Sequence, residues 1–189
     1  MLAVAQINGG GDFQYTDTSY RNSSRIMLDD HELAAWILEK LRPYIADIEK
    51  EDGEIHQRYS RSRENTWPPV RLSRLNERLR FLKYGPGQFF KPHCDGTYGT
   101  PDLKEVSYYT LQIYLSGDAK SLKGGATRFW VLDRSKKEPK FVDVESRMGR
   151  VLIFEQAGLL HSGEKVREGE KISMRTDFMY ARESDVSSN

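Results

Sequence analysis

The residues with the clearest chemical potential lie in the stretch FFKPHCDGTYG, at positions 89–99. Three residues of metal-ligand type, His93, Cys94 and Asp95, are adjacent there. Because alternate side chains of a β-strand project to the same face, His93 and Asp95 can reach one ion together while Cys94 points away. We therefore predict His93 and Asp95 as metal ligands, and Cys94 as a small buried residue rather than a redox centre.

A third ligand has to come from another part of the chain. His31 stands at a predicted helix start and His56 in a polar stretch, whereas His161 follows the apolar run VLIFEQAGLL and precedes Ser-Gly. His161 is therefore the best-placed third ligand. Two imidazoles and one carboxylate on one face of an ion form the facial triad of non-haem Fe(II) oxygenases. Zinc is the competing metal, but neither a thiolate-rich ligand set nor two histidines on one helical turn occurs.

Two predicted strands each combine an apolar face with a polar one. The polar positions are, in chain order, Thr110, Gln112, Tyr114, Lys171, Ser173, Arg175 and Asp177. Such a face either meets solvent or lines a barrel lumen that holds a polar ligand. In the second case Lys171 and Arg175 would point at an anion.

A helix is predicted before these strands. Apolar residues at helical spacing predict it over about residues 30–50, with Asp30 as the N-cap and a bend at Pro43. The polar residues 51–70, which end in Trp-Pro-Pro, predict a long loop that could be a substrate lid or packing over the helix. Residues 1–20 predict an extended arm or loop.

From residue 78 onward the pattern changes to short β-like runs separated by turn residues, which predicts a sandwich or barrel with the helix on one outer face. The runs cover residues 78–84, 107–115, 126–132, 140–145, 149–156 and 171–180. We expect a single domain over residues 1–181, with its β core at about 72–181 and a frayed tail at 182–189.

The composition excludes several classes of function. The 189 residues carry 29 basic and 28 acidic side chains, a net charge of +1, so no nucleic-acid footprint is expected. No segment is apolar enough to span a membrane, and the N-terminus lacks the basic start of a signal peptide. One cysteine excludes an intrachain disulfide, so we expect the cytoplasm or nucleus. The sequence does not indicate an oligomeric state.

The assembled pattern resembles the iron(II)- and 2-oxoglutarate-dependent dioxygenases, in particular their prolyl 4-hydroxylase-like branch. The matching segments, over about residues 72–181, are LNERLRFLKYGPGQFFKPHCDG, YYTLQIYLS, GGATRFW and GRVLIFEQAGLLHSGEKVREGEK. The resemblance implies a double-stranded β-helix, or jelly roll, with helices packed on one sheet.

The resemblance also implies roles for individual residues. His93, Asp95 and His161 look like the iron ligands, and Lys171 matches the basic residue that pairs with the far carboxylate of 2-oxoglutarate. Arg175 is the alternative to Lys171, because its fork suits a carboxylate. The other matching cosubstrate residues are Tyr114 at the same carboxylate, Tyr84 near the other end, and Thr110.

The implied reaction couples decarboxylation of 2-oxoglutarate, which gives succinate and CO2, to hydroxylation of an unactivated C–H bond by O2. Ascorbate is the expected reductant. A peptidyl or protein residue, as in prolyl hydroxylation, is the expected substrate, and a small metabolite or free amino acid is the alternative. Candidate substrate residues are Arg25, Asn76, Arg78, Gln112 and Trp130. Two other classes stay open: a cupin-like metal-binding protein without oxygenase activity, and a non-enzymatic binding domain.

Overall fold

The structure is a computed structural model that describes residues 5–8, 13–15, 17–51, 69–118, 120–131 and 139–182. Most of the predicted loop, at 52–68, and the predicted tail, at 183–189, lie outside these ranges. No helix in the described part of the chain is long and apolar enough to cross a membrane.

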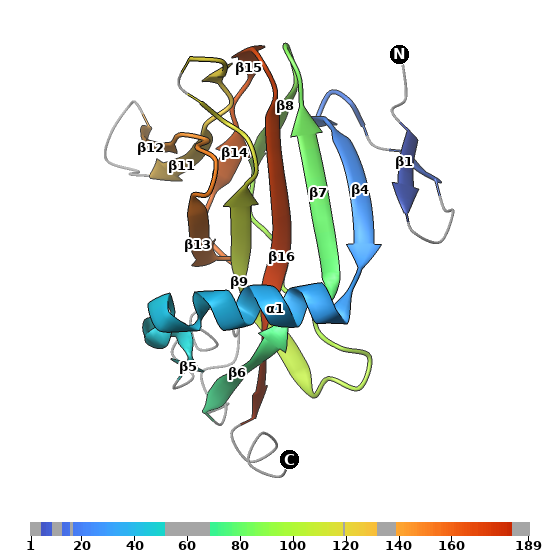
Figure 1. The fold of residues 1–189 in the computed structure, drawn as a ribbon, viewed down its shortest axis with the longest axis vertical. Helices are drawn as coiled ribbons and strands as arrows, with labels where there is room; N and C mark the ends of the chain where they lie inside the picture. The colour runs from blue at the N-terminus through green and yellow to red at the C-terminus, as the bar shows by residue number, and fades with distance from the viewer. Residues whose placement is uncertain are drawn as a thin grey trace.

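The larger of the sheets has nine strands, in the order β13-β9-β16-β7-β4-β1-β2, with β6 paired to β16 and β5 to β6 (Figure 1). Its strands are β1 (Ala5–Asn8), β2 (Phe13–Tyr15), β4 (Ser24–Asp29), β5 (Lys50–Glu51), β6 (Val70–Leu75), β7 (Arg78–Tyr84), β9 (Glu105–Tyr114), β13 (Val151–Glu155) and β16 (Lys171–Arg182). The long strand β16 lies between β9 and β7 and is antiparallel to both.

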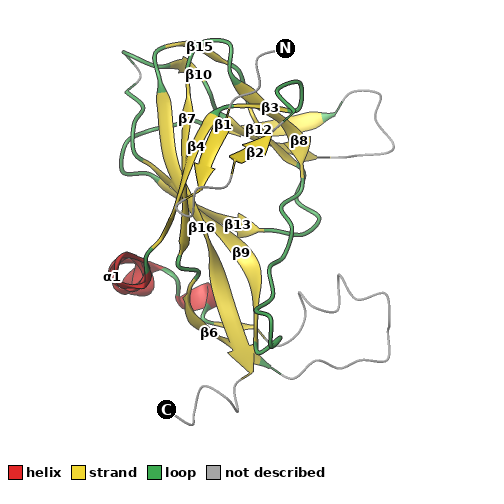
Figure 2. Cartoon of the chain, turned by 90° about the vertical axis from the view of Figure 1, so that its right-hand side faces the viewer, coloured by secondary structure: helices red, strands yellow, loops and turns green. Residues whose placement is uncertain are grey.

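A second sheet of five strands, in the order β12-β11-β14-β8-β3, forms the other layer (Figure 2). Its strands are β3 (Arg21–Asn22), β8 (Phe89–His93), β11 (Thr127–Val131), β12 (Lys140–Val144) and β14 (His161–Gly163). Two short antiparallel strands, β10 (Lys123–Gly124) and β15 (Val166–Glu168), form a further small sheet. The two layers confirm the predicted double-stranded β-helix, and all six predicted runs contain strands.

The predicted helix forms but ends earlier than expected. Helix α1 (His31–Leu41) has Asp30 as its N-cap, as predicted, and the Asp30 carboxylate accepts a hydrogen bond from the Leu33 amide at 2.9 Å. The chain then continues as two 3-10 turns, Arg42–Tyr44 and Ala46–Ile48. The expectation of one helix to residue 50 was wrong because the proline in the first turn has no amide hydrogen to continue the helical ladder.

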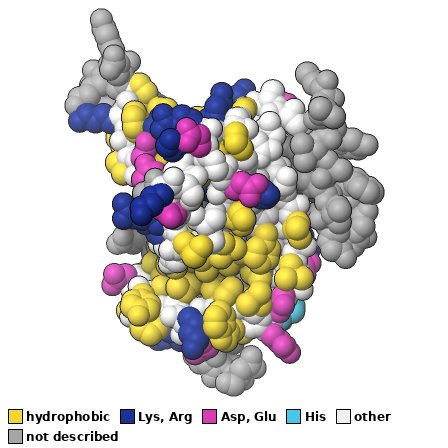
Figure 3. Space-filling view, turned by 45° about the horizontal axis from the view of Figure 1, so that its top comes forward, with side chains coloured by type: hydrophobic (Ala, Val, Ile, Leu, Met, Phe, Trp, Pro, Cys, Tyr) yellow, Lys and Arg dark blue, Asp and Glu magenta, His cyan; other side chains and the backbone are white. Residues whose placement is uncertain are grey.

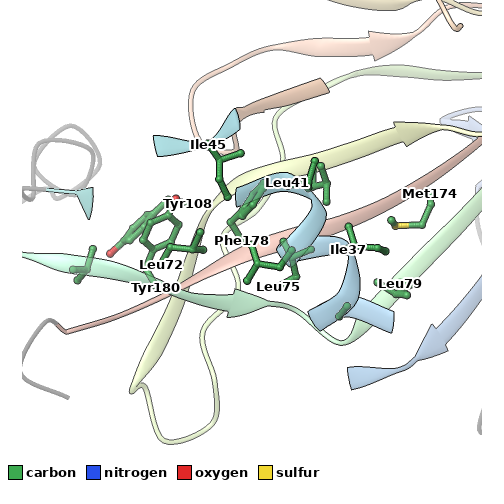
Figure 4. Packing of buried hydrophobic residues seen from close by; sticks show 14 residues of the cluster. Ile37, Leu41, Ile45, Leu72, Leu75, Leu79, Tyr108, Met174, Phe178 and Tyr180 are labelled. Atoms are coloured by element: carbon green, nitrogen blue, oxygen red, sulfur yellow. The ribbon is translucent and has the colours of Figure 1, made fainter. Parts of the chain in front are cut away.

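Helix α1 buries its apolar stripe against the outer face of the larger sheet (Figure 4). The helix contributes Ala34, Ile37, Leu38 and Leu41 to the cluster. The sheet contributes Leu72, Leu75, Leu79, Tyr108, Leu111, Met174, Phe178 and Tyr180. Burying one such side chain contributes about 1.5–3 kcal/mol. The apolar positions of β9 and β16 thus face the helix, and their polar positions face the second sheet.

The larger sheet begins earlier in the chain than predicted, since β4 and β6 belong to it. Strand β4 has an inverted pattern: its apolar Ile26 is 64% exposed on the outer face, whereas Arg25 is half-buried on the inner one. Hydrophobic side chains gather on the molecular surface on this side of the protein (Figure 3). The segment predicted as an extended arm or loop contains β1 and β2, which form an antiparallel pair beside β4.

Leu111 tests this account of the core. The side chain is 0% exposed, so Leu111→Ala should lower the free energy of unfolding by about 2–5 kcal/mol, which a chemical denaturation curve measures. The matched change Leu103→Ala, at a leucine that is 74% exposed, should stay within about 0.5 kcal/mol of the parent protein. Equal losses in the two variants would contradict this core.

Candidate metal centre and its pocket

The three predicted metal ligands converge at one point between the sheets. His93 at the end of β8 and His161 at the start of β14 are directly paired across the two strands. Asp95 follows two residues after His93 and places its Oδ1 3.7 Å from the Nε2 atom of each histidine. One ligand atom from each of the three residues lies within 4.8 Å of the other two. Residues 66 positions apart in the chain therefore form a compact N, N, O donor set.

Backbone contacts orient both imidazoles. Nδ1 of His93 lies 2.8 Å from the Lys91 carbonyl oxygen, and Nδ1 of His161 lies 2.9 Å from that of Leu159. A carbonyl oxygen only accepts, so each Nδ1 carries the proton and each Nε2 keeps its lone pair toward Asp95. Burial lowers the pKa of His93 to about 4 and also lowers that of His161. Both rings are thus neutral at pH 7, as metal binding requires.

Asp95 is held by two different contacts. Its Oδ2 accepts a hydrogen bond from the Thr110 hydroxyl at 2.7 Å, which leaves Oδ1 toward the histidines. The same Oδ1 lies 2.9 Å from Nη1 of Arg175, whose Nη2 is 3.6 Å from Asp177. Two neutral imidazoles and one oriented carboxylate fit a divalent ion of the Fe(II) type and leave further coordination positions open.

A buried cation lies at the other end of the cavity. Lys171 is 4% exposed, its Nζ is 3.4 Å from Oγ1 of Thr127, and the rings of Tyr84 and Tyr114 each lie 5.5 Å from it. Tyr114 donates its phenolic hydrogen to the same threonine oxygen at 2.7 Å. Burial lowers the pKa of Lys171 to about 8, so most of it is still charged at pH 7. No carboxylate of the described residues forms an ion pair with Lys171, so this cation fits an anionic ligand.

The metal ligands and this lysine line the same cavity. Its walls are Leu82, Tyr84, Phe90, His93, Asp95, Gln112, Thr127, Phe154, His161, Ser162, Gly163, Lys171, Ser173 and Arg175. The polar faces of β9 and β16 therefore line a lumen and are not a solvated outer surface.

The other predicted site residues lie at varying distances from this cavity. Arg78 is exposed and pairs with Asp29, and Asn76 is buried in the turn before β7, where it accepts a hydrogen bond from the Arg78 amide. Trp130 donates to the hydroxyl of Ser162, which lines the cavity. Arg25 lies beside the cavity, directly across the strands from its wall residue Leu82.

The predicted burial of Cys94 was wrong, because this side chain is exposed. Thr127 was missed as a site residue, although its oxygen contacts Tyr114, Gln112 and Lys171. The GGATRFW segment that contains it was a signal that could have identified it.

Comparison with known families decides the class of this site. The family model described as the 2OG-Fe(II) oxygenase superfamily matches residues 79–179, a span that contains all three residues of the donor set and Lys171. The chain belongs to this superfamily. A 2OG-Fe(II) oxygenase is a 2-oxoglutarate-dependent dioxygenase, and its family implies Fe(II), 2-oxoglutarate and O2. Membership therefore weighs against the cupin-like and non-enzymatic alternatives.

Solved structures agree with the fold of this oxygenase. A Pseudomonas putida prolyl-4-hydroxylase is 17% identical, with a TM-score of 0.55 over 87% of this chain and 73% of that one. A Trichoplax adhaerens prolyl hydroxylase, in complex with a peptide fragment of the hypoxia inducible factor oxygen degradation domain, is 13% identical, with a TM-score of 0.52 over 93% and 70%. A viral collagen prolyl hydroxylase of Paramecium Bursaria Chlorella virus-1 is 20% identical, with a TM-score of 0.50 over 86% and 80%. No curated protein matches the sequence.

Thr110 tests whether the donor set is organised as described. Thr110→Val removes the hydrogen bond that orients Asp95, so Co(II) affinity should fall about 10- to 100-fold, measured by titration of its visible absorption. Thr110→Ser keeps the hydroxyl and should stay close to the parent affinity. Equal Co(II) affinities for the valine and serine variants would contradict this role.

Proposed function

We propose that this dioxygenase hydroxylates a peptidyl or protein residue in the manner of a prolyl 4-hydroxylase, with succinate and CO2 as co-products. The observation that carries the proposal is the donor set of His93, Asp95 and His161 in one cavity with the buried cation of Lys171. In this proposal the three residues hold Fe(II), and the lysine binds the far carboxylate of 2-oxoglutarate.

Each part of the cavity has a task in this reaction. The bound iron supplies the activation of O2 that is coupled to decarboxylation of 2-oxoglutarate. Lys171 and the hydroxyl groups of Tyr114 and Thr127 bind one end of the cosubstrate and thereby orient its other end toward the metal ligands. The rings of Phe90 and Phe154 in the cavity wall exclude water from the reacting atoms.

The contacts of the two basic residues favour Lys171 over Arg175 as the cosubstrate cation. The guanidinium of Arg175 already contacts Asp95 and Asp177, whereas the ammonium group of Lys171, within the described ranges, contacts neutral oxygen and aromatic groups. The far carboxylate of 2-oxoglutarate is therefore stabilised more by the charge of the lysine than by the arginine, which already has two carboxylates beside it.

The fold of prolyl hydroxylases, one of them solved with a bound peptide, supports a peptide as the substrate. We further propose ascorbate as the reductant that keeps the iron in the Fe(II) state.

The proposal is tested by measuring succinate. The protein is incubated with Fe(II), ascorbate, 2-oxoglutarate and O2, with and without proline-containing peptides, and succinate and hydroxylated peptide are quantified. Succinate formation should require the metal, be stimulated by peptide, and be lost in His93→Ala, Asp95→Ala and His161→Ala.

Asn76→Ala is a control variant. It alters a buried turn residue outside the cavity, so it shows how far a loss of folding stability alone lowers succinate formation. Retained activity in any one of the three ligand variants would remove that residue from the metal site. An absence of succinate under every condition would overturn the proposal.

Lys171 gives the reaction a pH dependence with a defined sign. Above pH 8 the lysine loses its proton, so the dissociation constant of 2-oxoglutarate should rise with pH, by up to about tenfold per unit. Lys171→Ala should weaken binding by roughly 2–5 kcal/mol and remove most of this dependence. Calorimetric titration of the Fe(II)-loaded protein without O2 measures both effects. If Lys171→Ala leaves binding unchanged while Arg175→Ala weakens it, the two residues exchange roles.

A further inference from the structure

Four arginines gather at one side of the cavity, and the reaction as described uses none of them to bind a ligand. We call Arg21, Arg25, Arg80 and Arg175 the arginine cluster. Arg80 on β7 is directly opposite Arg175 on β16, and Arg25 on β4 is directly opposite Leu82 on β7. Directly opposite residues share a face of the sheet, so three neighbouring strands present a guanidinium on the cavity side.

The fourth member of the cluster comes from the other sheet. Arg21 on β3 places its guanidinium carbon 5.4 Å from the ring centre of Phe90, a residue of the cavity wall. The cluster therefore includes residues of both layers beside the cavity, on the side where β4 lies next to β7 (Figure 1).

The members of the cluster act on one another as like charges. Burial and, to a smaller extent, the like charges of Arg21, Arg80 and Arg175 together lower the pKa of Arg25 to about 10. The hydroxyl of Tyr84, inside the cavity, is also within the field of three members of the cluster. Bringing four cations together in a half-buried region costs free energy that an anion would recover.

Two carboxylates already neutralise part of this charge. Asp177 lies 3.0 Å from Arg80 and 3.6 Å from Arg175, and Asp95 lies 2.9 Å from Arg175. In the proposed reaction Asp95 binds the metal. Asp177 is then the carboxylate that remains as a counter-charge for Arg80 and Arg175. The Nε of Arg175 is buried and has no hydrogen-bond partner among the described residues.

We propose that the arginine cluster binds a carboxylate of the substrate, so that the substrate is an acidic peptide with Asp or Glu next to the hydroxylated residue. This inference rests on the proposed function and narrows its substrate class. Guanidinium forks match a carboxylate with two parallel hydrogen bonds, which a lysine could not supply.

The cosubstrate is not the natural ligand of this cluster. Arg175 is four residues from Lys171 along β16, roughly 13 Å at the rise of a strand. Arg25 is two strands away from β16, roughly 10 Å at the usual strand spacing. A five-carbon diacid held at Lys171 and directed to the metal ligands does not also reach Arg25, so the cluster can accept a second anion while 2-oxoglutarate is bound.

The test uses two degenerate peptide pools of the form acetyl-XXPXX-amide. In the acidic pool each X includes Asp and Glu, and in the neutral pool these are replaced by Asn and Gln. Peptide-stimulated succinate formation by the Fe(II)-loaded enzyme should be at least about tenfold higher with the acidic pool, as expected for loss of a charged hydrogen bond. The preference should also decrease as the salt concentration rises.

Variants connect this preference to the cluster. Arg25→Gln and Arg21→Gln should each reduce the ratio of acidic to neutral stimulation, a quantity that does not depend on total activity. Lys83→Gln is the control, because it removes a cation from the outer face of β7, the strand that carries Arg80 of the cluster, and Lys83 pairs there with Glu170. It should leave both the ratio and the basal activity unchanged.

The outcomes separate the two proposals. Equal stimulation by the pools, or none by either, overturns the acidic-substrate inference, as does an unchanged ratio in both arginine variants. Calorimetry of 2-oxoglutarate binding to the Fe(II)-loaded protein is measured in parallel. If that binding is absent as well, the proposed function itself fails, whereas normal binding with no pool preference leaves the function standing.

Discussion

The antiparallel pairing of β16 with both β9 and β7 is the interaction on which the rest of the structure depends. Its register places Met174 and Phe178 on the face covered by helix α1 and Lys171 and Arg175 on the face that lines the cavity. A shift of this strand by one residue would exchange the two sets of side chains and destroy the core and the site together. The burial of the apolar face therefore also fixes the positions of the charged groups.

The charged groups inside the cavity are balanced by short, specific contacts. Removing an ion from water costs several kcal/mol, and that cost is offset only where a partner or a hydrogen bond replaces the lost water. Asp95 and Asp177 meet this condition through contacts to Thr110, Gln156 and the guanidinium groups. Lys171 meets it least well, with a threonine oxygen and two aromatic rings. The burial of the Lys171 charge therefore costs free energy, and a bound anionic ligand can offset that cost.

Much of the fold and the centre of the site were predictable because they follow from alternation along strands. The pairing of His93 with Asp95 and the inward face of β16 come from side chains two residues apart sharing a face, whereas His161 was chosen because it follows an apolar strand and precedes a turn. Strand β4 was missed because its apolar residues face outward. The alternation of its sequence therefore does not show which face of the strand is buried. Contacts between distant segments, such as that of Thr127 with Tyr114, cannot be derived from local patterns. The same holds for the arginine cluster, whose members are brought together by the register of four strands.

Because Arg175 contacts Asp95, the carboxylate of the donor set already has a cationic partner before any metal binds. A guanidinium already contacts the oxygen that faces both histidines, so a divalent ion bound there would replace one cation by another. The affinity of the site for a metal would then be a difference between two ionic interactions. Ions that bind carboxylates weakly gain little from the exchange, while an ion that also binds two imidazoles gains enough to displace the side chain. An internal ion pair can in this way select among metals, because only an ion that binds the donor set more strongly than the arginine does can replace it.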